Sequence, residues 1–150
     1  MSVLVVALVV AAGVLVWLDY AHRDDEQRRD RYVQTARQTA LNLTTVRAAS
    51  AKNDIDRILA GASGEFKSEF DGRVDPFRSV VEEAKVTSEG QIIEAALEKE
   101  FGDQATVLVA AKATVANAGQ AEPEARLFRF RITVTDDGHR MTASKVEFVA

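Results

Sequence analysis

The sequence predicts an α+β domain that follows a single N-terminal transmembrane helix. Three observations support this prediction. The chain opens with an uncharged apolar run, its middle shows helical periodicity, and its last third alternates apolar and polar residues as strands do. A run of helices followed by a run of strands favours one antiparallel sheet that packs its apolar face on the helices.

The apolar run covers residues 2–18 and contains no charged side chain. As a helix it would measure about 25 Å, the lower limit for crossing the hydrocarbon core of a bilayer. A buried core helix would show polar positions on one face, and a cleaved signal peptide would show a basic start and a break after small residues. We therefore expect residues 1–21 to form an uncleaved membrane anchor. The residues expected to contact lipid or its headgroup boundary are Val3, Leu4, Leu8, Val14, Leu15, Trp17, Leu18 and Tyr20.

Two further features concern how this anchor would sit in a membrane. Small residues at close spacing let a partner helix approach, and the candidates are Ala7, Ala11 and Gly13. Basic residues near a span favour the cytoplasmic side, and they follow the run here as Arg23, Arg28, Arg29 and Arg31. Charge alone therefore favours a cytoplasmic domain.

Composition excludes several classes of function. The chain carries 19 basic and 23 acidic residues, a net charge of −4, whereas a nucleic-acid partner calls for a basic surface. It contains no cysteine, which excludes disulfides, thiolate catalysis and cysteine-ligated metals. About 130 residues remain behind the anchor, which is enough for one ordinary domain.

Residues 22–47 are expected to form a charged stalk that continues into the first helix of the domain. Charges of both signs occur at helical spacing over residues 19–31, which suits a solvated helix leaving the membrane. The alternative is contact with lipid headgroups or a partner, through Arg23, Arg28 and Arg29. Beyond the stalk, an apolar stripe recurs at three- and four-residue steps: Val33, Ala36, Ala40, Leu43 and Val46.

The middle of the chain predicts two more helical segments. Asn53 or Asp54 can cap a short helix, which glycines then end. Ser63 opens a longer helix, which the Asp75-Pro76 step should kink or restart. One face of this longer helix is apolar and is expected to lie in the core: Phe66, Phe70, Val74, Phe77 and Val81.

The last third predicts the strands of a meander. Residues 105–117 and 126–135 alternate apolar and polar side chains, and the Asp137-Gly138 step favours a type I′ hairpin turn into a last strand. The apolar face of that last strand shifts partway, which predicts a bulge near Ser144. The preceding residues 88–101 fit a helix by period and propensity, or a strand by alternation, and both alternatives stay open.

The sequence shows no motif of an active site. His22 and His139 cannot be joined into one site by spacing, and there is no phosphate-binding loop or nucleophile elbow. Arg129 and Arg131 lie on the polar face of an expected strand and could contact an anion or an acidic partner, or simply be solvated. The inward strand faces are wholly apolar, which disfavours catalysis but would allow a lipid to bind. We therefore expect no enzyme activity, metal or cofactor.

Three stretches of the chain resemble the Mce-associated membrane proteins, which accompany the mammalian-cell-entry (Mce) lipid importers of mycobacteria and their relatives. These stretches are residues 35–46, 53–66 and 103–117, and they contain an aliphatic helix, a Gly-Glu-Phe step and an Ala-Thr-Val-Leu-Val strand. The positions that carry the resemblance are Asp54, Leu59, Gly64, Phe66, Ala105, Val107 and Val109.

The resemblance implies a fold, a place and a role. The fold would be a nuclear transport factor 2-like (NTF2-like) cone, a curved sheet wrapped over helices, with residues 88–101 as a strand. Residues 48–150 would form a domain facing the periplasm, anchored by one span in the plasma (inner) membrane. The role would be a non-enzymatic accessory subunit that stabilises or assembles an Mce-type importer of fatty acids, mycolic acids or sterols. Its partners would be Mce-domain subunits, a permease, an ATPase and membrane lipid.

Two alternatives share the same architecture. One is a scaffold subunit of another envelope machine, such as the inner-membrane assembly factor of a type IV secretion system. The other is a free-standing cone domain that binds a lipid or another ligand in its cavity. The partners recovered with the chain would separate the first from the Mce role, and a bound lipid without partners would indicate the second.

Overall fold

The computed structural model describes residues 24–119 and 121–150. The chain divides into two compact units, residues 1–31 and residues 32–150. The predicted anchor, its small residues and Arg23 lie outside the described residues. Within the described ranges, no helix is both long enough and apolar enough to cross a membrane. In the first unit residues 24–31 are helical, and Arg28 pairs with Asp25 at 3.5 Å.

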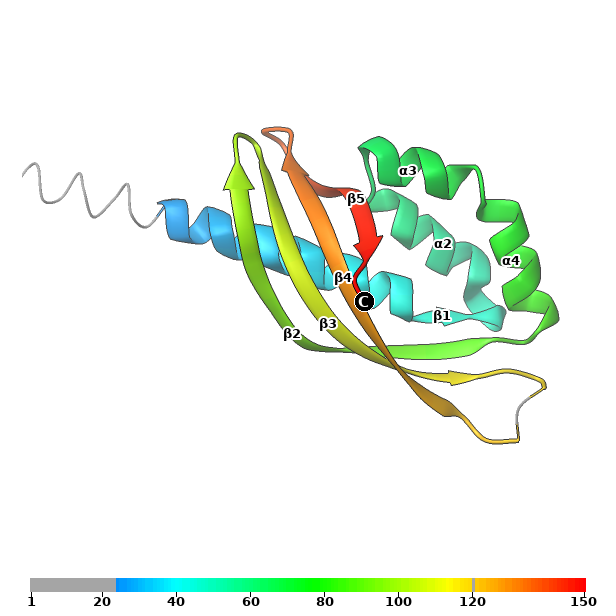
Figure 1. The fold of residues 1–150 in the computed structure, drawn as a ribbon. Coiled ribbons are helices and arrows are strands. Elements are labelled where there is room, and N and C mark those ends of the chain that lie inside the picture. Colours follow the sequence, from blue (N-terminus) through cyan, green and yellow to red (C-terminus); the bar gives the residue numbers. More distant parts are fainter. Residues whose placement is uncertain (1–23, 120) are drawn as a thin grey trace, which may run out of the picture. The chain divides into compact units, whose positions relative to one another are not determined.

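The second unit is built on one five-stranded antiparallel sheet, whose strands follow one another in chain order. The strands are β1 (Val46–Arg47), β2 (Thr87–Phe101), β3 (Gln104–Ala116), β4 (Glu124–Asp136) and β5 (Met141–Phe148). The three long strands curve over the helical layer, so the sheet has a concave inner face and a convex outer face (Figure 1). The α+β class and the meander are therefore confirmed.

The core lies between the concave face and the helices. Alternate positions on β3 and β4 are buried, as the sequence predicts: Val107, Val109, Ala111, Phe130, Ile132 and Val134. The helix of residues 32–44 belongs to the same core cluster, and Tyr32, Ala36 and Ala40 on it are at most 1% exposed. The two alanines leave room for the helix to lie close to the sheet, and removing this apolar surface from water stabilises the fold.

This helix ends at Thr44, before the end of its predicted apolar stripe. Val46 is buried, but it lies in β1 and pairs with Ser88 of β2. The stripe continues past the helix because a residue at the end of a helix and one in the strand that follows can face the same core. Periodicity alone does not separate these two cases.

Three short helices follow β1 and the 3₁₀ turn η1 (Ala48–Ser50). They are α2 (Ala51–Ala60), α3 (Gly64–Asp71) and α4 (Val74–Glu83). Ser63 precedes α3 as predicted, and the longer helix does restart, at Val74. The predicted cap of α2 at Asn53 or Asp54 is wrong, because the helix begins earlier and Ser50 holds the N-cap position.

Residues 88–101 are a strand, as the family resemblance implies. They form most of β2, which pairs with β3 along its length. Helical propensity is overridden because this pairing satisfies the backbone and turns Ile92, Ala95 and Leu97 toward the core.

The hairpin after β4 exists, but its predicted type I′ turn is wrong. That turn needs positive φ at both central residues, and only Gly138 has it, with φ of 85°. Instead, the side chain of Asp137 accepts hydrogen bonds from the backbone N–H groups of His139 and Arg140, at 2.9 and 2.8 Å. These bonds hold a wider loop and lower the pKa of the Asp137 carboxyl.

A bulge at Ser144 is confirmed. Thr133 pairs with Lys145 and Val134 pairs with Ala143, so Ser144 has no opposite residue. The free edge of β5 is covered at this point, because Ala143 exchanges backbone hydrogen bonds of 2.8 and 2.9 Å with residues 61–63. On the opposite side of the sheet, β1 is only two residues long, so β2 forms most of that edge, and it carries irregularities between Ile92 and Glu94 and between Leu97 and Lys99.

At Gly90, β2 approaches the end of the helix of residues 32–44 closely. A Cβ added at Gly90 would lie 2.7 Å from the Cβ of Thr44, which real Cβ atoms do not tolerate. The backbone N–H of Gly90 donates a hydrogen bond of 3.1 Å to the hydroxyl of Thr45. A glycine inside a strand is typical of such a close contact.

Candidate functional site

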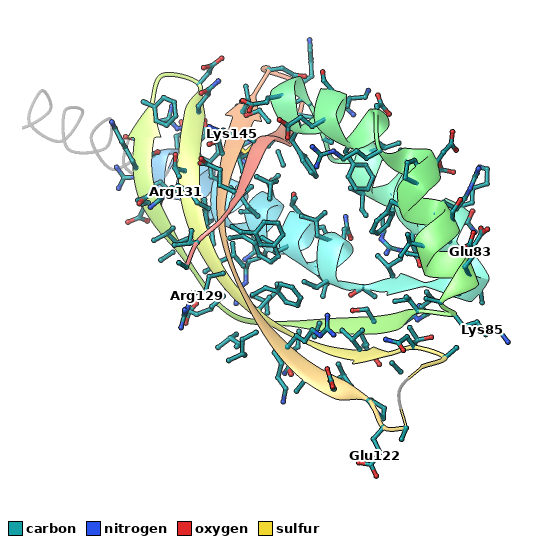
Figure 2. All side chains as sticks on the ribbon, turned by 45° about the vertical axis from the view of Figure 1, so that its right-hand side comes forward. Glu83, Lys85, Glu122, Arg129, Arg131 and Lys145 are labelled. Atoms are coloured by element: carbon teal, nitrogen blue, oxygen red, sulfur yellow. The ribbon has the colours of Figure 1, made fainter. Side chains whose placement is uncertain are left out.

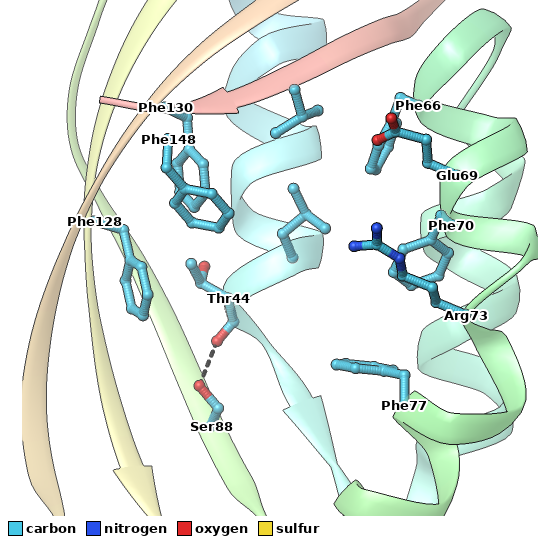
Figure 3. A pocket seen from close by; sticks show the side chains of 12 residues that line it. Thr44, Phe66, Glu69, Phe70, Arg73, Phe77, Ser88, Phe128, Phe130 and Phe148 are labelled. Atoms are coloured by element: carbon cyan, nitrogen blue, oxygen red, sulfur yellow. Dashed lines mark hydrogen bonds between the residues drawn. The ribbon is translucent and has the colours of Figure 1, made fainter. Parts of the chain in front are cut away.

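A cleft of about 320 Å³ opens between the concave face of the sheet and the helices (Figure 3). Its inner end is formed by Leu43 and Thr44, at the end of the long helix. One wall comes from β4 and β5, and the other from α3, α4 and the step between them. The aromatic residues of the two walls are Phe128, Phe130 and Phe148 on the sheet, and Phe66, Phe70 and Phe77 on the helices.

The rings of each wall contact one another. On the helical wall Phe66 and Phe70 have ring centroids 5.9 Å apart, and Phe70 and Phe77 are 5.7 Å apart. On the sheet wall the Phe130 and Phe148 centroids are 5.2 Å apart. The predicted phenylalanine stripe is therefore only partly core: Phe66 is buried, but Phe70 and Phe77 are half-buried and line an open cleft.

The polar groups of the cleft fall into two pairs. The hydroxyls of Thr44 and Ser88 are both bound: Thr44 donates to the carbonyl of Ala40 at 2.7 Å, and Ser88 donates to the carbonyl of Thr44 at 2.7 Å. Glu69 and Arg73 are exposed, and their charged ends point into the space between the walls (Figure 3). A cleft with these groups can bind an apolar chain and a charged end.

Asp54 is one of the positions that carry the family resemblance, and its side chain is buried. It lies outside this cleft and stabilises the fold. It accepts hydrogen bonds from the Arg47 backbone N–H and the Ser50 hydroxyl, both at 2.9 Å, and from the Arg57 guanidinium at 2.8 Å. Burial raises the pKa of Asp54, but these bonds and the charge of Arg57 together lower it below its ordinary value. The residue ties β1, η1 and α2 together.

The outer face of the sheet carries a second, shallower feature, which we call the outer hollow. It has a volume of about 240 Å³, and its residues include Ala96, Leu108, Ala110 and Val149, with Glu94 and Arg129 among them. Leu108 is 37% exposed. Arg129 is exposed, lies on the outer face away from the helices (Figure 2), and has no ion pair within residues 24–119 and 121–150.

Arg131, the other arginine of this strand predicted to contact a partner, is paired within the sheet. Its guanidinium donates two hydrogen bonds of 3.0 Å to the Glu98 carboxylate, and these bonds and the charge of Glu98 raise the pKa of Arg131. Of the two strand arginines, Arg129 is therefore the one without an ion pair to a described residue, and it lies beside the outer hollow. His139 lies in the exposed hairpin loop, and no group of three or more metal-ligating acidic, histidine or cysteine side chains occurs in the described part of the chain.

Sequence reasoning missed Glu69 and Arg73. They lie four residues apart around a helix break, and the spacing alone could have placed them on one side of the phenylalanine stripe. What the sequence could not show is that the stripe faces an open space.

Solved structures of low sequence identity share this fold. An IcmL-like type IV secretion system protein from Legionella pneumophila superposes with a TM-score of 0.65 at 10% identity, covering 81% of this chain and 91% of that one. The periplasmic domain of DotI gives 0.63 at 12% identity, with 78% and 91% covered. An Ntf2-like protein involved in plasmid conjugation gives 0.55 at 14% identity, with 82% and 49% covered. These likenesses show that the curled sheet and its helices form an NTF2-like fold.

Sequence comparison gives a nearer relative. The protein Rv1363c of Mycobacterium tuberculosis (strain ATCC 25618 / H37Rv) is 36% identical over 138 residues, which are 92% of this chain and 53% of that protein. The chain thus spans about half the length of the curated relative that it matches. The family described as "Uncharacterized protein Rv1363c/MT1408-like" matches residues 1–150. This chain belongs to the Rv1363c/MT1408-like family.

Proposed function

We propose that this chain is a non-enzymatic scaffold subunit of a membrane-bound machine in the cell envelope. The observation that carries the proposal is the outer hollow, where exposed Leu108 lies in an apolar surface beside the unpaired Arg129. Apolar surface with an arginine at its side is typical of the central part of protein–protein interfaces. The partner would supply an apolar side chain for the hollow and a carboxylate for Arg129.

The fold supports this role. The neighbours in structure include the periplasmic domain of DotI and an IcmL-like type IV secretion system protein. A domain of this kind, held to the plasma membrane by the predicted anchor of residues 1–21 and facing the periplasm, would present its outer face to neighbouring subunits. In this proposal the side chains of the outer hollow bind a partner subunit, and no side chain of the hollow or of the cleft takes part in a chemical reaction.

Two machines are candidates. The likeness in fold favours an assembly of the type IV secretion kind. The resemblance of residues 35–46, 53–66 and 103–117 to Mce-associated proteins favours a lipid importer, with Mce-domain subunits, a permease and an ATPase as partners. The identity of the bound partner distinguishes the two.

The test is purification of the tagged full-length chain from its native membranes in mild detergent, with mass spectrometry of the proteins recovered. A photoreactive residue at position 108 identifies what touches the outer hollow, and the same residue at Lys52, exposed on α2, is the control. Near-stoichiometric Mce-domain, permease and ATPase subunits would identify the importer, and secretion or conjugation subunits would identify the other machine. A chain recovered without any partner would overturn the proposal.

Charge reversal tests the role of Arg129 in the same experiment. Arg129→Glu should reduce the recovery of the partner about tenfold, because the new carboxylate would then repel the partner's carboxylate. Arg126→Glu is the matched control, since Arg126 lies on the same strand, is also exposed and is paired with Glu124 at 3.5 Å. Equal losses in the two variants would show that the outer hollow is not the contact.

A further inference from the structure

The two aromatic walls of the cleft face each other without meeting. Each wall has its own ring contacts, but among the residues that the structure describes no ring contact joins Phe66, Phe70 or Phe77 to the sheet wall. The cleft of about 320 Å³ is open to solvent, and an apolar occupant would remove the rings of both walls from water. Its volume lies at the lower end of the range for small-molecule sites.

On the side of β5, the rim of the cleft is apolar. Phe148, at the end of β5, is 75% exposed, although its ring contacts Phe130. A ligand that covers this ring removes apolar area from water, and this stabilises the bound state. A long apolar ligand that leaves the cleft would pass over this ring.

The charged groups at the rim define one end of the ligand. The guanidinium of Arg73 makes no hydrogen bond or ion pair to any described residue, and it points into the cleft (Figure 3). The hydroxyls of Thr44 and Ser88 already have partners within the chain. Arg73 is therefore the cation that remains available, and its planar donors match a carboxylate.

Glu69 lies on the same side of the cleft and weakens the attraction between Arg73 and a carboxylate. It lies four residues before Arg73, near the end of α3, and is also exposed, but the two side chains do not form an ion pair. A carboxylate ligand on Arg73 would be repelled by Glu69 through solvent. Glu69 thus lowers the affinity for an anion without removing the site.

We propose that the cleft binds a single-chain fatty acid, with the acyl chain between the two aromatic walls and the carboxylate on Arg73. One chain suits the volume, which is small for a diacyl lipid. This site lies on the concave side of the sheet and is separate from the outer hollow, so the scaffold role and the fatty-acid site can fail independently.

The experiment uses the full-length chain in phosphatidylcholine nanodiscs and a photoreactive fatty acid that carries a diazirine in its chain. Labelled peptides are mapped by mass spectrometry, which separates label in the cleft from label in the bilayer. Label is expected on peptides that contain Phe70 or Phe77 and on those that contain Phe128 or Phe148. Competition by unlabelled dodecanoate and by dodecanol then measures what the carboxylate contributes.

Three variants sharpen the test. Glu69 and Arg73 are exposed and Arg78 is half-buried with its side chain 41% exposed, so the fold should tolerate a polar replacement at each. Arg73→Gln should weaken competition by dodecanoate about tenfold, and Glu69→Gln should strengthen it about two- to threefold. Neither change should alter competition by dodecanol. Arg78→Gln is the matched control, because Arg78 lies on α4 but is paired with Asp75 at 3.0 Å and does not line the cleft.

Any of three results would overturn the proposal. Label found only outside the cleft would show that the fatty acid partitions into the bilayer alone. Equal competition by dodecanol and dodecanoate would show that no carboxylate is recognised. Equal effects of Arg73→Gln and Arg78→Gln would show that Arg73 has no special role. Because the nanodisc takes up the same share of fatty acid in each sample, the ratios between variants report on the protein.

Discussion

Asparagine in place of Asp54 keeps the shape of this buried side chain and removes its charge. In the native protein both carboxylate oxygens accept hydrogen bonds. One accepts from the backbone N–H of Arg47 and the hydroxyl of Ser50, and the other accepts from the guanidinium of Arg57. The amide of asparagine has one accepting oxygen, so its NH₂ group must face one of these donors. At least one hydrogen bond is lost and one donor is left unpaired.

The magnitude follows from burial and from the kind of bond. A hydrogen bond to a charged group contributes about 1.5–3 kcal/mol, and an unpaired buried donor costs about 1–3 kcal/mol. Asp54 is only 2% exposed, so water has little access to its side chain, although the Arg57 side chain is 41% exposed and can be partly solvated. We expect Asp54→Asn to lower the free energy of unfolding by about 2–4 kcal/mol, which for a domain of this size lowers the melting temperature by on the order of 10 °C.

The assay is urea unfolding of the full-length chain in detergent micelles at pH 7, followed by circular dichroism. Asp56→Asn is the matched control, because Asp56 lies on the same helix but its side chain is 57% exposed and pairs only with Lys52. That variant should change the free energy of unfolding by less than about 0.5 kcal/mol. If the two variants unfold at the same urea concentration, the reasoning about Asp54 is refuted.

The pH dependence gives an independent check. The pKa of Asp54 is lowered in the folded protein, so its contribution to stability is complete above the unfolded pKa of about 3.9 and is lost as the pH falls through the folded pKa. The difference in stability between the native protein and Asp54→Asn should therefore be constant from about pH 7 to pH 5 and narrow only below about pH 4. A difference that already narrows near pH 6 contradicts the lowered pKa.

Three other substitutions test the fold by the same unfolding measurement. Gly90→Ala should lower the free energy of unfolding by about 1–3 kcal/mol, because its Cβ would collide with Thr44; an unchanged value would show that the close approach is absent. Lys85→Gly should raise it by about 1 kcal/mol, since Lys85 has a φ of 50° at the end of α4, and a loss of stability would count against this backbone conformation. Arg131→Gln should lower it far less than Asp54→Asn does, because the pair with Glu98 is exposed, and the effect should shrink in high salt; a loss as large as that of Asp54→Asn would show that the exposed pair stabilises the fold strongly.

Much of the fold could be predicted because the strands alternate and the helices carry periodic stripes. The positions of β3 and β4, the restart of the helix before Pro76 and the bulge at Ser144 all follow from local pattern. Residues 88–101 could not be assigned from pattern, because their helical propensity and their strand alternation are balanced. Pairing with β3, a contact between distant residues, decides the outcome.

The site was harder to predict than the fold, for a physical reason. An apolar stripe such as Phe66, Phe70 and Phe77 looks the same in sequence whether it meets another surface or an open space. Arg131 was a candidate for partner contact, but its pair with Glu98 joins β4 to β2 across the intervening β3. Such a pair depends on the order of strands, and a single sequence does not fix that order.

The two edges of the sheet determine how copies of this protein can associate. One edge is closed where residues 61–63 bond to Ala143 of β5. On the other side, β1 covers only Thr87 and Ser88 of β2, so the rest of the outer side of β2 pairs with no strand in the described part of the chain, and β2 carries two irregularities there. An edge of this kind resists pairing with a second sheet. Even at high local concentration, copies of this domain would therefore not polymerise strand to strand, and an ordered array would have to form through the faces of the sheet.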